Sequence, residues 1–188
     1  MSKSKKLETE VVLCEGKTDI FKEVLFSFTD PSLPFFIEDV NVKLHDIDLN
    51  VANGKCCDSV IFSGILFINV IYKVRGTAVT NAVTGIVTSD DFIRHQTQLV
   101  PISGCIPMEC EQFKKCDKNV SAKLVDVCIA ESHILTGIVT ESPVNPFPIY
   151  DKLREQVCIQ IKAKVVTDEI ITINFEDEDK CDKCDKWY

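Results

Sequence analysis

Cysteine is the residue type through which this 188-residue chain could do most chemistry, because it holds ten of them. They are Cys14, Cys56, Cys57, Cys105, Cys110, Cys116, Cys128, Cys158, Cys181 and Cys184. A cysteine can ligate zinc, exchange disulfides as a reactive thiolate, or form a stable cross-link. A chain of this length buries a sizeable core without disulfides, so the cysteines are not needed to compensate for a small one.

The motif Cys-Asp-Lys-Cys at residues 181–184 has the spacing of a zinc knuckle. A complete knuckle needs a second close pair, and Cys105, Cys110 and Cys116 are too widely spaced to supply it. A thiol-redox pair would have the same Cys-x-x-Cys motif, but such pairs begin a helix beside a βαβ unit, whereas this one lies in a charged C-terminal stretch. A zinc site that uses Cys181 and Cys184 therefore stays an alternative, and a redox site is disfavoured.

Disulfide cross-linking between subunits agrees best with where the cysteines lie. Cys14, Cys181 and Cys184 fall toward the ends of the chain, and Cys128 and Cys158 fall on outward faces of expected strands. These positions suit bonds to another subunit better than a closed internal framework. The adjacent cysteines at 56 and 57 point to opposite faces if they lie on a strand, so they bond different partners. All ten cysteines are candidates for bonds between subunits, although one or two of them can be buried free thiols.

Other catalytic patterns are missing from the sequence. The histidines His45, His95 and His133 each lie alone in a strand-like stretch, and none belongs to a recognisable nucleophile motif. The seven glycines form no phosphate-binding loop, and the acidic run at 176–179 lacks the glycine and ordered ligands of a calcium loop. We therefore expect a protein that is not an enzyme and that uses no cofactor.

Charge and hydropathy limit the partners. The formal net charge is -8, from 29 acidic and 21 basic residues, which disfavours binding to nucleic-acid phosphates. The longest apolar stretch, Val60–Tyr72, is shorter than the roughly 20 residues of a membrane-spanning helix. The polar segment Met1–Glu10 has no apolar run typical of a secretory signal. Ten cysteines nevertheless indicate an oxidising destination.

Hydrophobic residues alternate with polar ones along most of the chain, which is the period of a β-strand. In Val157–Val165 the odd positions are apolar and Cys158 falls on the polar face, as in a half-buried antiparallel strand. The alternation in Val40–Val51 changes phase near residues 45 and 46, which predicts a β-bulge. Val60–Tyr72 is apolar on both faces and predicts a central strand covered on both sides, with a bend or close backbone approach at Gly64.

Further strands are expected over residues 78–88, 92–100, 120–129, 134–141 and 170–175, and the seven prolines are expected between them. Residues 20–28 have helical as well as strand periodicity, and we favour a strand there, whereas residues 150–156 could form one helical turn. The pattern predicts an antiparallel, jelly-roll-like β-sandwich at residues 31–175. Residues 1–30 are expected to form an N-terminal arm with a lead-in strand, and residues 176–188 a charged tail.

Four segments resemble the SPOCS family of clostridial spore-coat and spore-assembly proteins. The stretch VIFSGILFINVIY at 60–72 is similar to the valine-rich core strand of that family. Residues 35–49 resemble its preceding strand, residues 98–102 (Gln-Leu-Val-Pro-Ile) its Pro-Phe hinge with Ile102 in place of Phe, and residues 153–165 its late strand. The resemblance spans residues 35–175. The family usually has few cysteines, so this chain departs from it there.

The resemblance implies a structural role and carries over no catalytic residue. Proteins of this family are made in the mother cell and assembled on the forespore, and mother-cell lysis then exposes them to oxidising surroundings. The cysteine pattern, together with a free N-terminal arm, also resembles subunits of endospore appendages. We therefore expect a subunit of the endospore surface (coat, exosporium or appendage) that joins copies of itself head to tail, with other spore-coat proteins as further partners. A non-polymerising coat adaptor and a zinc-binding module are the alternatives.

Overall fold

The computed structural model of the chain describes residues 3–52, 59–76, 78–109, 120–142 and 145–175. These residues form strands and connecting turns, and the described part of the chain contains no helix, so none that could cross a membrane. The strands are β1 (Lys3–Ser27), β2 (Pro34–Val51), β3 (Ser59–Val74), β4 (Ala78–Thr80), β5 (Val87–Ser89), β6 (Phe92–Glu109), β7 (Val120–Ser142) and β8 (Asn145–Phe175).

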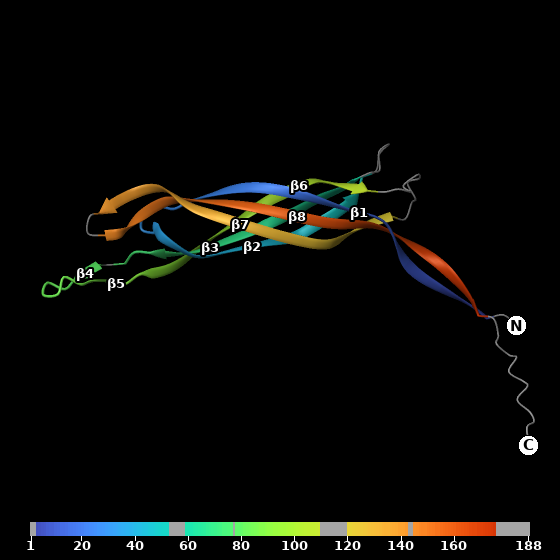
Figure 1. Ribbon diagram of the computed structural model, residues 1–188, viewed down its shortest axis with the longest axis horizontal. Helices are drawn as coiled ribbons and strands as arrows, with labels where there is room; N and C mark the ends of the chain where they lie inside the picture. Colours follow the sequence, from blue (N-terminus) through green and yellow to red (C-terminus); the bar gives the residue numbers. More distant parts are fainter. Residues whose placement is uncertain (1–2, 53–58, 77, 110–119, 143–144, 176–188) are drawn as a thin grey trace, which may run out of the picture.

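Six of the strands form a single antiparallel sheet in the order β2-β3-β6-β1-β8-β7, which curls into a half-barrel (Figure 1). The short strands β4 and β5 form a separate hairpin at one end. The prediction of an all-β antiparallel fold is confirmed. A sandwich of two separate sheets is not confirmed, because one continuous sheet supplies both walls of the core.

The sheet consists of two three-stranded halves that are joined at one narrow place. Strands β2, β3 and β6 form one half, and β1, β8 and β7 form the other. Among the described residues, β6 and β1 are joined by two residue pairs, Glu15 with Glu109 and Gly16 with Met108. At the opposite side of the half-barrel β2 and β7 lie close together, but the described residues form no ladder between them. The inner faces of the two halves therefore pack on each other, and their outer faces point in opposite directions.

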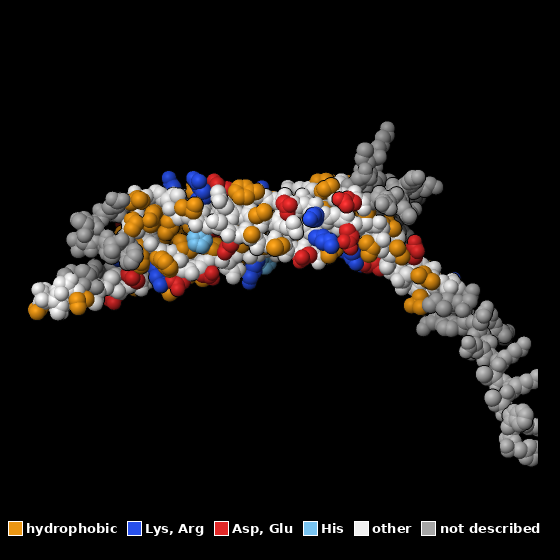
Figure 2. All heavy atoms as spheres, in the orientation of Figure 1, with side chains coloured by type: hydrophobic (Ala, Val, Ile, Leu, Met, Phe, Trp, Pro, Cys, Tyr) orange, Lys and Arg blue, Asp and Glu red, His pale blue; other side chains and the backbone are white. Residues whose placement is uncertain are grey.

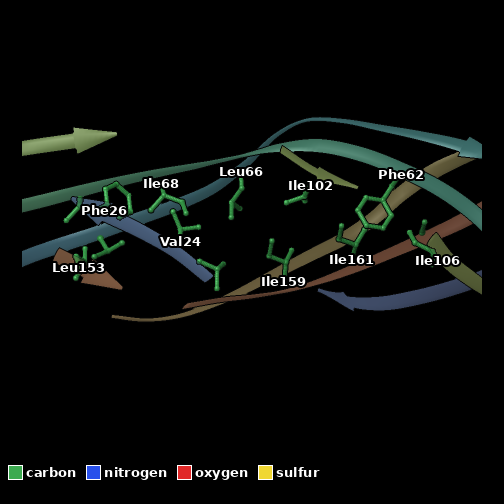
Figure 3. Packing of buried hydrophobic residues seen from close by; sticks show 14 of the residues in the cluster. Val24, Phe26, Phe62, Leu66, Ile68, Ile102, Ile106, Leu153, Ile159 and Ile161 are labelled. Carbon is green, nitrogen blue, oxygen red and sulfur yellow. The ribbon is translucent and has the colours of Figure 1, made fainter. Parts of the chain in front are cut away.

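The core fills the space between the two halves. In β3 the even-numbered side chains are buried; Phe62 lies against Ile161 of β8, and Ile68 lies beside Val24 and Phe26 of β1 (Figure 3). Each such side chain contributes about 1.5–3 kcal/mol relative to an exposed position. The even residues of β3 thus share the core with the odd residues of β8, whose burial the alternation in residues 157–165 predicts.

The β-bulge expected in β2 is present and explains the glycine opposite it. The register between β2 and β3 shifts between His45 and Asp48, and Asp46 has a positive φ of 50°. A Cβ added at Gly64 would lie 3.2 Å from Leu44 Cδ1 and 3.5 Å from the carbonyl oxygen of His45. The bulge brings the backbone of β2 close to β3, so the predicted close approach at Gly64 is confirmed.

Four expectations about single elements are wrong. β3 is covered on one face only, and Ile61 on its other face is 53% exposed. Residues 150–156 belong to β8 rather than to a helical turn, and the expected strand at 78–88 is the β4–β5 hairpin. Four of the seven prolines expected between strands lie inside strands: Pro101 and Pro107 in β6, and Pro146 and Pro148 in β8. The two in β6 are tolerated there because, among the described residues, β6 pairs with β3 along this length and with β1 at its last two residues, so a missing N–H can face the edge away from β3.

The N-terminal residues expected to lack strand structure form the start of β1. Residues 3–12 pair with residues 166–175 of β8, and this two-stranded ribbon projects beyond the half-barrel (Figure 1). At its root Glu10 accepts hydrogen bonds from Lys123 of β7 and Lys164 of β8, the latter at 2.9 Å. These bonds lower the pKa of the Glu10 carboxyl. The residues of the expected arm are thus a strand paired within the chain.

Candidate functional site

Two free thiols, Cys128 of β7 and Cys158 of β8, lie on the outer face of the β1–β8–β7 half. The strand register arranges the side chains of this face in rows that run from β1 through β8 to β7. The rows are Asp19, Gln160 and Cys128; Phe21, Cys158 and Ala130; Glu23, Gln156 and Ser132; Leu25, Arg154 and Ile134; and Ser27, Lys152 and Thr136. We call these fifteen residues the thiol face. All of them are exposed or partly exposed, so the prediction that Cys128 and Cys158 point outward is confirmed.

The two thiols are diagonal neighbours that are not bonded to each other. Cys128 pairs with Gln160 and Cys158 pairs with Ala130. The two thiols therefore lie in adjacent rows of the same face, one on β7 and the other on β8. Diagonal neighbours in an antiparallel ladder are about 7–8 Å apart, whereas a disulfide needs Cα atoms within about 7 Å. Both thiols are therefore exposed and unbonded, and neither is placed to bond the other.

The charges of the thiol face are balanced within the face itself. It carries two acidic residues, Asp19 and Glu23, and two basic ones, Lys152 and Arg154. Gln160 donates a hydrogen bond to Asp19 at 2.9 Å, and Glu23 lies 3.8 Å from the Arg154 guanidinium and accepts a hydrogen bond from Gln156 at 3.2 Å. Such surface pairs add little stability, but they leave this face neutral in a chain of net charge -8.

Hydrophobic side chains lie beside the thiols. Phe21 pairs with Cys158 and is 62% exposed, and Leu25 and Ile134 are also more than half exposed. Figure 2 shows hydrophobic side chains in groups among the charged ones, most densely at the end where β7 and β8 meet, and the exposed Ile138 and Val139 of β7 belong to that end. The thiol face is thus partly apolar, as a contact surface would be.

The other candidate cysteines divide into three groups. Cys105 of β6 is exposed and free, on the outer face of the opposite half. Cys14 is buried in β1 and is disulfide-bonded, so it is not an exposed thiol, and no disulfide joins two of the described cysteines. The remaining candidates lie outside the described residues, the proposed zinc pair among them: Cys56, Cys57, Cys110, Cys116, Cys181 and Cys184. Among the described residues no group of three or more His, Cys, Asp or Glu side chains could hold a metal ion.

The three histidines lie apart from one another. His45 of β2 packs edge-on against the Phe67 ring, with 5.8 Å between ring centroids. His95 of β6 lines an open hollow of about 730 Å³ together with Arg94 and the buried Tyr72, whose pKa is raised by burial. His133 of β7 points to the inner side, with its Nδ1 4.0 Å from the Glu155 carboxylate. The free thiols of β7 and β8 point to the outer side, so His133 and these thiols are on opposite faces of the sheet.

A buried carboxyl group on the inner face was not anticipated from the sequence. Glu155 of β8 is 0% exposed, and neither of its carboxylate oxygens has a hydrogen-bond partner. Burial, followed by repulsion from Glu131 of β7, raises the pKa of Glu155 to about 8. Burial also raises the pKa of Glu131, against the opposing effect of nearby His133. Glu155 has the same parity as Leu153 and Val157, and this alternation is the signal in the sequence that could have placed it inside.

The fold and the site together define an all-β protein with free thiols on the outer faces of both halves of its sheet. Comparisons with protein-family models, with curated proteins and with solved structures found no match to the chain.

Proposed function

We propose that this chain is a structural subunit of the bacterial endospore surface that self-assembles into a disulfide-cross-linked coat or appendage fibre. The observation that carries the proposal is the placement of the free thiols. Cys128 and Cys158 are exposed on one outer face of the half-barrel, and Cys105 is exposed on the opposite outer face. The resemblance of residues 35–175 to spore-coat proteins supplies the cellular setting, in which the chain is made in the mother cell and deposited on the spore surface.

Thiols on two opposite sides favour a polymer over a closed pair. A subunit with a reactive group on a single face can cross-link one neighbour, whereas a subunit with reactive groups on opposite faces can cross-link two. Contacts between unlike faces that do not close into a ring produce an open filament. Disulfides would then make the assembly resist heat and denaturant, because subunits could separate only after reduction.

The cross-linking is tested by non-reducing electrophoresis of air-oxidised protein. We expect the wild type to form a ladder of oligomers that reductant collapses to monomer, and the variant with Cys105, Cys128 and Cys158 all changed to Ser to lose most of it. Electron micrographs of the same sample should show filaments or sheets. An oxidised wild type that stays monomeric would exclude a cross-linked subunit and favour a non-polymerising coat adaptor. Near-stoichiometric zinc in protein purified under reducing conditions would favour the zinc-binding alternative.

A further inference from the structure

The outer face of the β2–β3–β6 half carries a strip that has no charged side chain. Five outward rows of β3 and β6 make it up, and each row pairs one residue of β3 with one of β6. The rows are Ile61 and Cys105, Ser63 and Ser103, Ile65 and Pro101, Phe67 and Leu99, and Asn69 and Thr97. We call these ten residues the apolar strip. Leu99 is 65% exposed and Ile61 is 53% exposed, and the other members are exposed or partly exposed.

We propose that the apolar strip of one copy packs against the thiol face of a second copy, and that Cys105 of the first is cross-linked there to Cys128 or Cys158 of the second. The proposal rests on the proposed function and deepens it by naming the two surfaces that meet. Because the two surfaces point in opposite directions on each copy, the contact repeats head to tail and leaves no closed pair.

Electrostatics favours a second copy as the occupant of the strip. Two chains that each carry a net charge of -8 repel each other unless they meet through surfaces without excess charge. The apolar strip has no charged residue, and the charges of Asp19, Glu23, Lys152 and Arg154 on the thiol face cancel. The pair of surfaces is therefore one through which two copies can approach without like-charge repulsion at the contact.

The chemistry of disulfide formation also favours a second copy of the chain as the occupant of the apolar strip. A disulfide at Cys105 needs a second thiol, and each copy of the chain presents two of them on its opposite face. The hydrophobic neighbours also match, since Phe21, Leu25 and Ile134 beside the thiols would lie against Ile61, Phe67 and Leu99. Two thiols at diagonal positions give Cys105 a choice of partner and so tolerate a small shift in the packing.

The size of the surfaces explains why a covalent bond would be needed. Five rows of a two-stranded strip measure about 30 Å by about 10 Å, from the spacing of residues along and between strands. This is well below the roughly 800 Å² per partner that a stable protein interface buries. The contact by itself is therefore transient, and the disulfide makes it permanent.

Forming the disulfide is an oxidation, and dioxygen can act as the oxidant. Two thiols, one on each copy, lose two protons and two electrons in forming the S–S bond. Dioxygen accepts them and becomes hydrogen peroxide. The expected yield of cross-links therefore depends on how long the two surfaces stay together while both thiols are reduced.

The test uses two full-length variants that can join only to each other through these surfaces. Cys105→Ser, made with natural nitrogen, keeps the thiol face, and Cys128→Ser/Cys158→Ser, labelled with ¹⁵N, keeps Cys105. After oxidation of the mixture, mass spectrometry should find linked peptides in which the labelled peptide contains Cys105 and the unlabelled one contains Cys128 or Cys158. Neither variant oxidised alone should give that link.

A matched pair of substitutions tests the packing itself. Leu99→Asp places a charge in the apolar strip and should slow formation of the Cys105 cross-link at least tenfold. Val83→Asp is the control, because Val83 is 93% exposed in the turn between β4 and β5, away from both surfaces, and the cross-linking rate should not change.

The outcomes separate this inference from the proposed function. Links between two Cys158 residues, a ladder built entirely from other cysteines, or an unchanged rate for Leu99→Asp would overturn the proposed contact while leaving a cross-linked subunit in place. An oxidised wild type without any oligomers would overturn both.

Discussion

The free energy of unfolding of the wild-type chain is expected to fall by about 4 kcal/mol between about pH 5 and about pH 8, and the Glu155→Gln variant is expected to lose most of this dependence. The cause is the carboxyl group of Glu155, which is 0% exposed and has no hydrogen-bond partner. Burial and the neighbouring Glu131 carboxyl raise its pKa from 4.5 to about 8.

The sign follows from which state holds the proton. The folded chain keeps the Glu155 proton until about pH 8, while the unfolded chain releases it near pH 4.5. Between these values the unfolded chain binds fewer protons, so stability falls as the pH rises, by about 1.4 kcal/mol per pH unit. The contribution is fully present below the unfolded pKa and is lost by the folded pKa. The raised pKa of Glu131 acts in the same direction, and Glu10, whose pKa is lowered, acts in a more acidic range.

Urea unfolding, followed by circular dichroism at several pH values, measures the effect. Glu169→Gln is the control, because Glu169 is exposed on β8 in the projecting ribbon, and this variant should keep the wild-type slope. Glu155→Leu removes a fully buried carboxyl that must lose its proton near pH 8, so it should be more stable than the wild type near that pH. A Glu155→Gln variant with the wild-type slope would contradict the prediction.

The sequence predicted those parts of the fold that depend on local alternation. Residues 157–165 alternate without interruption, and the structure buries their odd positions and exposes Cys158, as predicted. The phase change near His45 and Asp46 correctly located the bulge in β2. In both places the side-chain parity alone decides which residues face the core, and parity is readable from the sequence.

The sequence could not predict how the strands are ordered or where they are unpaired. The sequence predicts Pro101 and Pro107 between strands. Their place inside β6 depends on an edge of that strand that β1 leaves free, and strand order is not readable from the sequence. Lys3–Glu10 has no hydrophobic alternation, and it is a strand because β8 pairs with it. The parity of Glu155 with Leu153 and Val157 places it inside, but residues 150–156 are also compatible with a helical turn, so the pattern alone does not identify Glu155 as buried.

The sequence predicted only part of the candidate site. The outward directions of Cys128 and Cys158 follow from strand parity, and the structure confirms them. Their position as diagonal neighbours depends on the β7–β8 register, and the placement of Cys105 on the opposite face depends on the curl of the whole sheet. Neither depends on local sequence, so the thiol face and the apolar strip became visible only in the folded chain.

Gly16→Ala is expected to destabilise the chain by on the order of 3 kcal/mol by opening the join between the two halves. A Cβ at Gly16 would lie 2.2 Å from the carbonyl oxygen of Pro107 and 2.7 Å from Sδ of Met108. The Met108 side chain can move aside, but the oxygen belongs to the backbone of β6, so that strand itself must shift. Because the described part of the β1–β6 join is two residue pairs long, such a shift disrupts it.

Urea unfolding gives the loss of stability, and hydrogen exchange locates it. The amides of Gly16 and Met108 should exchange faster in the variant, while those of residues 157–165 in the centre of the other half keep their protection. Gly64→Ala is the matched control, since its nearest contact is 3.2 Å from the flexible end of Leu44, and its loss should stay within about 1 kcal/mol. Equal losses for the two variants would show that the join contributes little.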